Sequence, residues 1–406
     1  MSFQLNIYSV LLLLPFTQGI LFGTLLMTRK QEKYIKANRL LGMILLLMSI
    51  KIAFWMLGFA GWYDTHDAFT SLMFYFPFNT VCLMGPLLYF YFLAITNQDF
   101  RFERRHLRHL WLPATWFFLI IGKFSLDFLI YYPFPDTAAF QFGTKGPWAE
   151  LDKTVPVILI SYGSFSYYLW LTLKAYRTYR QYTQQNFSLQ ENVDFIWLRN
   201  LLLAIGTGLL IMFAYQLINW VYPLSYKADW YSYLFLGTLV YYVSIKGYQV
   251  QMEPKPALHF IPATVQDASS IAVKSAPLPD LELRLEHLTQ LLIQEKHYLI
   301  PDLTLAQLAK MAKVNTGILS RIINTGFSLN FNDFINSYRV REVITRFELK
   351  QHQRITLLSI ALECGFNSKA TFNRAFKKHT GKTPVEYLAG LETEQNIGIK
   401  QPVISG

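Results

Sequence analysis

A group of basic side chains lies near the C-terminal end of the chain, between residues 369 and 382, with no acidic residue among them. Its members are Lys369, Arg374, Lys377, Lys378 and Lys382. Their spacing separates them from Phe372, Ala375 and Phe376, which share the apolar face of one predicted helix. A concentrated positive helix face is the electrostatic footprint of nucleic-acid binding, and the alternative is an ordinary solvated face. We therefore expect this helix to contact nucleic acid.

Catalytic chemistry is not indicated by the sequence. The chain has no glycine-rich phosphate loop, HExxH motif or nucleophile elbow. Cys82 and Cys364 lie in separate regions, which predicts neither a disulfide nor a metal site. Asp64, His66 and Asp67 lie close together, but a solvated loop is favoured because no fourth ligand at a suitable spacing is visible. We expect no enzyme activity, no metal and no cofactor.

Two similar helix-turn-helix patterns position the polar side chains. In the first, Thr304 and Gln307 form a capping box, and Asn315 caps the following helix. In the second, Gly365 permits the turn and Ser368 caps the basic helix. In such a unit the second helix enters the major groove of DNA.

A longer helix is predicted between the two patterns, from Asn330 to about Phe347. It would fix the separation of the two recognition helices, so that they enter successive major grooves about 34 Å apart. Before the first pattern, leucines recur in a 4-3-4 rhythm at Leu281, Leu285, Leu288 and Leu292. We favour a helix packed on the first helix-turn-helix. A short dimer seam is the alternative, but two heptads are few for a stable coiled coil.

This stretch resembles the DNA-binding domain of AraC-type transcription regulators. The most specific part is IALECGFNSKATFNRAFKKHTGKTPVEY at residues 360–387, and NFNDFINSYRV at 330–340 is similar to the linker helix of sensor-coupled members. The resemblance covers roughly the last quarter of the chain. Leu388 departs from the pattern, where Arg is usual, which puts one phosphate contact in doubt.

The resemblance implies a set of DNA contacts. The base-reading candidates are Gly317, Ser320 and Arg321 in the first copy and Lys369, Ala370, Asn373 and Arg374 in the second. The phosphate-contact candidates are Thr316, Arg339, Lys377, Lys378 and Lys382. Because Gly317 has no side chain, the first copy is expected to read less sequence. Arg339 and Arg374 have the alternative role of pairing within the domain.

The first 250 residues consist mostly of long apolar runs. The chain is 52% hydrophobic and only 16% charged, and its formal net charge is +11. Runs long enough to span a bilayer lie near 5–28, 38–60, 69–95, 108–132, 154–175, 198–222 and 229–248. The first run lacks a basic leader and a small-residue cleavage site, so it is not expected to be a cleaved signal peptide.

Loop charges predict the orientation of these seven spans. With the N-terminus outside, the inner loops hold Arg29, Lys30, Lys33, Lys36, Arg39, Arg101, Arg104, Arg105, Arg108, Lys174, Arg177, Arg180 and Arg199. The outer loops then hold Lys145, Lys153 and Lys227. The positive-inside rule therefore places the C-terminus in the cytoplasm. Termini on opposite sides of the membrane require an odd number of spans, and seven satisfies this. We expect a multi-pass protein of the cytoplasmic (inner) membrane.

The predicted domain order follows from these observations. The fold class is all-α, with a seven-transmembrane helical bundle over residues 1–248. A proline-rich linker follows at 249–280, and the double helix-turn-helix domain occupies 281–390. Residues 391–406 are expected to form a loose tail.

Charged residues inside the predicted spans are candidates for a signal pocket. They are Lys51, Lys123 and Asp127. A charge within a membrane is costly unless it is paired or wetted, so it is a functional hypothesis by default. Lys123 and Asp127 lie one turn apart, so structural pairing is the favoured alternative for them.

Together the patterns predict a membrane-embedded one-component transcription regulator. Its partners would be double-stranded promoter DNA, the lipid bilayer and an unknown small-molecule or membrane signal, and a homodimer is left open. One alternative is proteolytic release of the DNA-binding domain from the membrane. Another is a transporter or membrane enzyme with a regulatory tail. The odd span count and the lack of an internal repeat disfavour the transporter.

Overall fold

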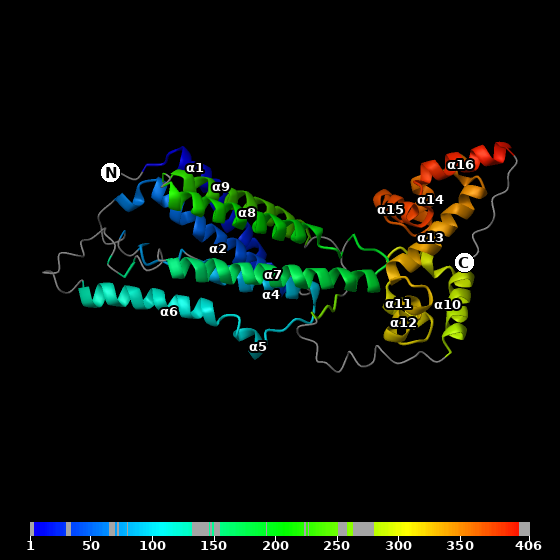
Figure 1. The fold of residues 1–406 in the computed structure, drawn as a ribbon, viewed down its shortest axis with the longest axis horizontal. Helices are drawn as coiled ribbons and strands as arrows, with labels where there is room; N and C mark the ends of the chain where they lie inside the picture. The colour runs from blue at the N-terminus through cyan, green and yellow to red at the C-terminus, as the bar shows by residue number, and fades with distance from the viewer. Residues whose placement is uncertain are drawn as a thin grey trace. The chain divides into compact units, whose positions relative to one another are not determined.

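The computed structural model describes residues 4–29, 34–64, 70, 73–78, 80–131, 146, 148–149, 155–191, 193–222, 225, 227–250, 258–262 and 280–397. Every regular element in these residues is a helix, which confirms the all-α class (Figure 1). The chain divides into two compact units. The N-terminal unit comprises residues 1–177 and 195–263, and the C-terminal unit comprises residues 178–194 and 264–406.

The N-terminal unit is built from long apolar helices. They are α1 (Ile7–Thr28), α2 (Ile35–Phe59), α4 (Val81–Thr96), α6 (Trp111–Ser125), α7 (Val155–Asn186), α8 (Ile196–Val221) and α9 (Lys227–Val250). Shorter elements are η2 (Trp62–Asp64), α5 (Arg104–Leu107) and η3 (Leu126–Tyr131). Each long helix overlaps one of the predicted apolar runs. Within the described residues, length and hydropathy together qualify α1 and α2 as helices that could cross a membrane.

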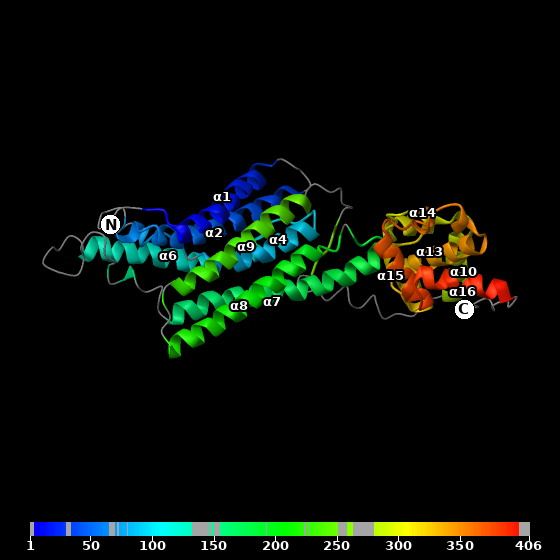
Figure 2. The same cartoon turned by 90° about the horizontal axis from the view of Figure 1, so that it is seen from above.

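Close backbone packing joins α1 to α2, and α1 also packs on α9 (Figures 1 and 2). A Cβ atom added to Gly42 would lie 2.7 Å from the carbonyl oxygen of Gly23 on α1. A Cβ atom on Gly19 would lie 2.1 Å from Oγ of Ser49 on α2. Small residues at a helix crossing let two backbones approach closely. The glycines of the first two apolar runs therefore serve helix packing.

Part of the predicted linker is fixed on the N-terminal unit. The backbone N–H of Gln98 donates to the carbonyl of Leu258 at 2.9 Å, and the N–H of Phe260 donates to the carbonyl of Thr96 at 3.1 Å. The side chains of Leu258 and Phe260 are buried. Residues 258–262 are thus held at the end of α4. Residues 251–257 and 263–279 of the predicted linker lie outside the described residues.

The C-terminal unit contains the two predicted helix-turn-helix patterns. Its helices are α10 (Leu281–Glu295), η7 (His297–Leu299), α11 (Leu305–Met311), α12 (Thr316–Gly326), α13 (Phe331–Glu348), η8 (Gln351–Gln353), α14 (Leu357–Glu363), α15 (Lys369–Thr380) and α16 (Pro384–Ile397). Helix α16 continues into the predicted tail as far as Ile397, which corrects the prediction of a loose tail from residue 391. Residues 398–406 lie outside the described part of the chain.

The predicted caps and turns are present in the C-terminal unit. Oδ1 of Asn315 accepts a hydrogen bond from the N–H of Gly317 at 2.8 Å. Oγ of Ser368 accepts one from the N–H of Thr371 at 3.2 Å. Gly365 has a φ of 89°, a left-handed conformation in which a Cβ is strained. Local sequence chemistry therefore sets the start of both recognition helices.

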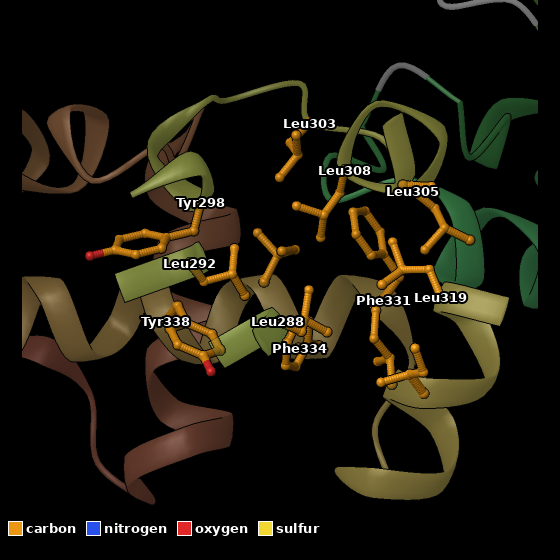
Figure 3. Close-up of a cluster of buried hydrophobic side chains, with 14 residues drawn as sticks. Leu288, Leu292, Tyr298, Leu303, Leu305, Leu308, Leu319, Phe331, Phe334 and Tyr338 are labelled. Atoms are coloured by element: carbon orange, nitrogen blue, oxygen red, sulfur yellow. The ribbon is translucent and has the colours of Figure 1, made fainter. Parts of the chain in front are cut away.

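Helix α10 packs on the first helix-turn-helix, as we favoured from the sequence. Leu288 and Leu292 of α10 are buried in one cluster with Leu308 of α11, Leu319 of α12 and Phe334 of α13 (Figure 3). This cluster is the core of the first half of the C-terminal unit. The apolar rhythm of α10 is thus satisfied within the chain.

Helix α13 supplies side chains to both cores of the C-terminal unit. Phe331 and Phe334 belong to the first core. Val343 and Phe347 belong to the second, where they pack with residues such as Phe372 of α15. One rigid helix is therefore shared by the two helix-turn-helix units. That it fixes the separation of the two recognition helices on DNA stays a prediction.

Arg339 of α13 is 1% exposed, which removes it from the phosphate-contact candidates. Its guanidinium donates to the carbonyl oxygens of Tyr298 and Ile300 at 2.7 Å each. It also donates to the carbonyl of Pro301 and to Oγ of Ser188, at 3.2 Å each. Burial lowers the pKa of Arg339 to about 10, so the group stays charged at neutral pH. The alternative role of Arg339, pairing within the domain, is the one the structure favours.

Replacing Arg339 is expected to destabilise the C-terminal unit. Arg339→Ala leaves several carbonyl groups without their charged donor, which we expect to cost about 3 kcal/mol or more. Arg341→Ala, which removes an exposed arginine on the same helix, is the matched control and should cost less than about 1 kcal/mol. Hydrogen exchange of α13 peptides in the full chain, followed by mass spectrometry, measures both values. Equal protection in the two variants would contradict the role of Arg339.

Candidate nucleic-acid interface

Helix α12 is the recognition helix of the first copy. Leu319, Ile322 and Ile323 are buried beneath it, so its opposite face is directed outward. On that face Gly317 is exposed, and Thr316, Ser320 and Arg321 are half-buried. Nδ2 of Asn324 donates to Oγ of Ser320 at 3.3 Å. The structure therefore brings the four first-copy candidates together on one face.

Helix α15 is the recognition helix of the second copy and the more strongly basic one. Phe372, Ala375 and Phe376 are buried against the core. The outward candidates are Lys369, Ala370, Arg374, Lys377 and Lys378, which are exposed, and Asn373, which is half-buried. Lys382, just beyond the helix, is exposed as well. The expected separation of the cations from the apolar face is confirmed.

Lys378 has an acidic neighbour that the sequence reasoning did not pair with it. Its Nζ lies 2.6 Å from Oδ2 of Asp333, in the first turn of α13. The ion pair joins the recognition helix α15 to the helix shared by both cores. Because Lys378 is partly neutralised, it is a weaker phosphate candidate than Lys377.

A half-buried carboxylate on the inner side of α13 belongs to the scaffold. Burial acts to raise the pKa of Glu342, but hydrogen bonds from Lys296 and Tyr298 outweigh it, and the pKa is lowered overall. These bonds to Glu342 Oε2 are 3.1 Å and 2.9 Å long. Burial raises the pKa of nearby Cys364 to about 12, so this thiol is neutral at pH 7. These groups are suited to support rather than to reaction.

A carboxylate from a distant part of the sequence lies at the start of α15. Both the Oγ of Ser368 and the Oγ1 of Thr371 donate hydrogen bonds to Oε1 of Glu191. Glu191 belongs to the segment 178–194 of the C-terminal unit. Its carboxylate lies at the N-terminal end of α15, whose first residues, Lys369 and Ala370, are base-reading candidates. Sequence reasoning missed this residue, because no local pattern connects positions 177 residues apart.

The three candidates in the apolar helices do not form one site. Lys51 lines a cavity of about 120 Å³, and Lys123 and Asp127 are outside its lining. Oδ2 of Asp127 accepts a hydrogen bond from the hydroxyl of Tyr75 at 2.6 Å, and Oδ1 accepts one from the N–H of Trp148 at 3.2 Å. Of the three candidates, Lys51 is the one that lines this cavity.

Metal ligands were not expected in this chain. Among the residues that the structure describes, there is no group of three or more His, Cys, Asp and Glu side chains placed to hold a metal ion. His66 and Asp67, considered from the sequence, lie outside the described residues. Cys82 and Cys364 are both buried free thiols.

Comparison with known proteins agrees with this geometry. Residues 308–390 match the family model described as a helix-turn-helix domain. Part of the C-terminal unit is therefore similar to known helix-turn-helix domains.

Two transcription regulators are similar to this region. An uncharacterized HTH-type transcriptional regulator of Staphylococcus aureus is 31% identical over 86 residues, which is 21% of this chain and 11% of that protein. The protein named Probable transcription factor PqrA of Proteus vulgaris is 41% identical over 49 residues, which is 12% of this chain and 40% of that protein. The chain thus spans less than half the length of either relative. No solved structure matches the chain significantly.

Two basic residues of α15 are expected to act differently on DNA. Arg374→Ala should weaken binding to a selected site by about 1–3 kcal/mol, because bidentate contacts to guanine are lost. Lys377→Ala should weaken binding to selected and random duplexes alike and lower the slope of log affinity against log salt by about one. Affinities of both variants for both duplexes over a salt series measure these effects. An equal loss on both duplexes for Arg374→Ala would assign it to the phosphates.

Proposed function

We propose that the protein is a membrane-embedded one-component transcription regulator. It binds promoter DNA through α12 and α15 and responds to a signal received by its apolar helices. The observation that carries the proposal is the coexistence, in one chain, of a region that matches a helix-turn-helix domain and a separate unit of apolar helices. A protein of this kind needs no second component to carry the signal to DNA.

Membrane insertion is supported by the N-terminal unit. Helices α1 and α2 have the length and hydropathy of membrane spans. Helices α4, α6, α7, α8 and α9 overlap the five further apolar runs, and large apolar side chains remain exposed on several of them. Examples are Leu210 and Ile211 of α8 and Phe118 of α6. Exposed apolar side chains of this kind suit contact with lipid. With seven spans, the positive-inside rule places the DNA-binding domain in the cytoplasm.

The path of the chain supports a mechanical link between signal and DNA. Residues 178–194 belong to the C-terminal unit, whereas the residues before and after them belong to the N-terminal unit. The DNA-binding unit is therefore connected to the apolar helices through this segment as well as through the linker. A shift of α7 or α8 can be passed on through it, and a change in dimerisation is the alternative route.

Proteolytic release is a weaker alternative, because segment 178–194 connects the DNA-binding unit to the apolar helices in addition to the linker. A cut within residues 249–280 would leave segment 178–194 on the other fragment. Ser188 of this segment accepts a hydrogen bond from the buried guanidinium of Arg339 and donates to the carbonyl of Leu303. A released domain would lose these contacts. A transporter or enzyme with a regulatory tail keeps no specific observation in its favour.

The proposal is tested by locating the protein and its DNA sites in cells. We expect the full-length chain in the alkali-washed membrane fraction and at discrete genomic positions. Those positions should be lost in an Arg321→Ala, Arg374→Ala double variant, whose membrane content should be unchanged. Chromatin immunoprecipitation and fractionation measure both. Release of the protein by the alkaline wash would contradict membrane insertion. Immunoprecipitation peaks that persist in the double variant would contradict sequence-specific DNA binding by these helices.

A further inference from the structure

The segment 187–191 is attached to the C-terminal unit independently of Glu191. The backbone N–H of Ser188 donates to the carbonyl of Leu303 at 3.1 Å, and Phe187 forms a bridge with Thr304. Nδ2 of Asn332 donates to the carbonyl of Ser188 at 2.7 Å. These contacts hold the segment beside α11 and α13. They place its carboxylate at the end of α15.

Glu191 lies where negative charge of DNA would approach. The N-terminus of a helix carries partial positive charge and free N–H groups, so it attracts phosphates and carboxylates. In helix-turn-helix proteins the N-terminal residues of the recognition helix contact base edges in the groove. Here the hydroxyls of Ser368 and Thr371 are already bonded to Glu191. A DNA phosphate at the same place would meet a charge of like sign at close range.

We propose that Glu191 is a built-in competitor of DNA for the second recognition helix. With segment 187–191 in place, α15 is held in a state that excludes DNA at its N-terminus. Binding of DNA requires the carboxylate to leave. The proposal rests on the DNA-binding function proposed above and adds how that function is restrained.

The position of the segment in the chain explains how the restraint could be removed. Helix α7 ends at Asn186 and α8 begins at Ile196, so the segment is the connection between two apolar helices. Because the connection is short, a displacement of either helix pulls directly on Ser188 and Glu191. A signal in the apolar helices would thereby free the N-terminus of α15.

The test compares DNA affinities of full-length variants in detergent or nanodiscs. Glu191→Ala and Glu191→Gln should each bind duplex DNA about 5-fold or more tightly than the parent protein, the range of a typical coupling energy. Asn332→Ala loosens the segment without changing its charge and should also tighten binding. Glu348→Gln removes an exposed negative charge from α13 and should change affinity less than Glu191→Gln does.

The outcomes separate the two proposals. Equal affinities of Glu191→Gln and Glu348→Gln would show a general charge effect and overturn the competition. Weaker binding by Glu191→Ala would make the residue a support of α15 and overturn it as well. A failure of the parent and all variants to bind any duplex would overturn the DNA-binding function and the restraint together.

A second, independent observation concerns the cavity that Lys51 lines. It has a volume of about 120 Å³ and lies between α2, α4, α7, α8 and α9. Its lining is almost entirely apolar, with residues such as Met48, Phe165 and Leu201. No acidic side chain is among the lining residues that the structure describes. The cavity therefore combines a cation with apolar walls.

Two polar groups of the lining are available to a ligand. Nζ of Lys51 lies 5.8 Å from the centre of the Tyr233 ring. Tyr91 is fully buried, and within the described structure its hydroxyl has no hydrogen-bond partner. A buried hydroxyl without a partner is costly, and an acceptor bound in the cavity would satisfy it and lie near a cation. A cavity of about 150 Å³ accommodates benzene, so this smaller cavity of about 120 Å³ suits a ligand smaller than benzene.

We infer that this cavity binds a short-chain monocarboxylic acid, with its carboxylate at Lys51 and its alkyl chain among the apolar walls. This inference rests on the proposed sensing function and specifies the chemical class of its signal. Propionate is the probe, and propionamide is its neutral analogue of the same shape.

Binding of ¹³C-carboxyl propionate to the full chain in nanodiscs, followed by NMR without DNA, tests the inference. We expect saturable binding that Lys51→Met weakens by about 10-fold or more, because a charge-assisted hydrogen bond is lost. Lys246→Met, at an exposed position of α9, should leave binding unchanged. Equal binding of propionamide, or of propionate to Lys51→Met, would overturn the acid site while leaving the DNA-binding function standing.

Discussion

The guanidinium of Arg339 carries a positive charge into the interior of the C-terminal unit, and the arrangement of that unit depends on how this charge is satisfied. In the bonds described above it donates to three backbone carbonyls of residues 298–301 and to Oγ of Ser188, and none of these acceptors is a carboxylate. Planar donors in a fixed fork can hold several acceptors at once. The connection between α10 and α11, the shared helix α13 and the segment after α7 are therefore fixed to one another at a single point.

This constraint determines how the two recognition helices are presented. Helix α13 gives side chains to both cores, so neither helix-turn-helix can turn freely about the other. The ion pair between Lys378 and Asp333 adds a tie from α15 back to the same helix. A protein that binds DNA through two recognition helices needs such rigidity, because both helices must enter their major grooves at a fixed spacing.

The same network includes the segment that follows α7. Ser188 bonds to Arg339, and three residues later Glu191 bonds to the first turn of α15. Segment 187–191 is therefore held by Arg339 at Ser188 and is bonded to the start of α15 at Glu191. Whatever displaces it changes both the buried network and the charge presented to DNA. Under the proposals above, segment 187–191 both restrains α15 and connects it to the apolar helices.

The sequence by itself determined the local features of this protein. Caps at Asn315 and Ser368, the turn at Gly365 and the outward cations of α15 depend on neighbours within a few residues, and all were predicted. The partners of Arg339 and Lys378 and the position of Glu191 could not be predicted in this way. They join residues that are far apart in the chain, and only tertiary packing decides which acceptor a long charged side chain reaches. The separation of Lys51 from Lys123 and Asp127 was decided likewise, because the cavity exists only between packed helices.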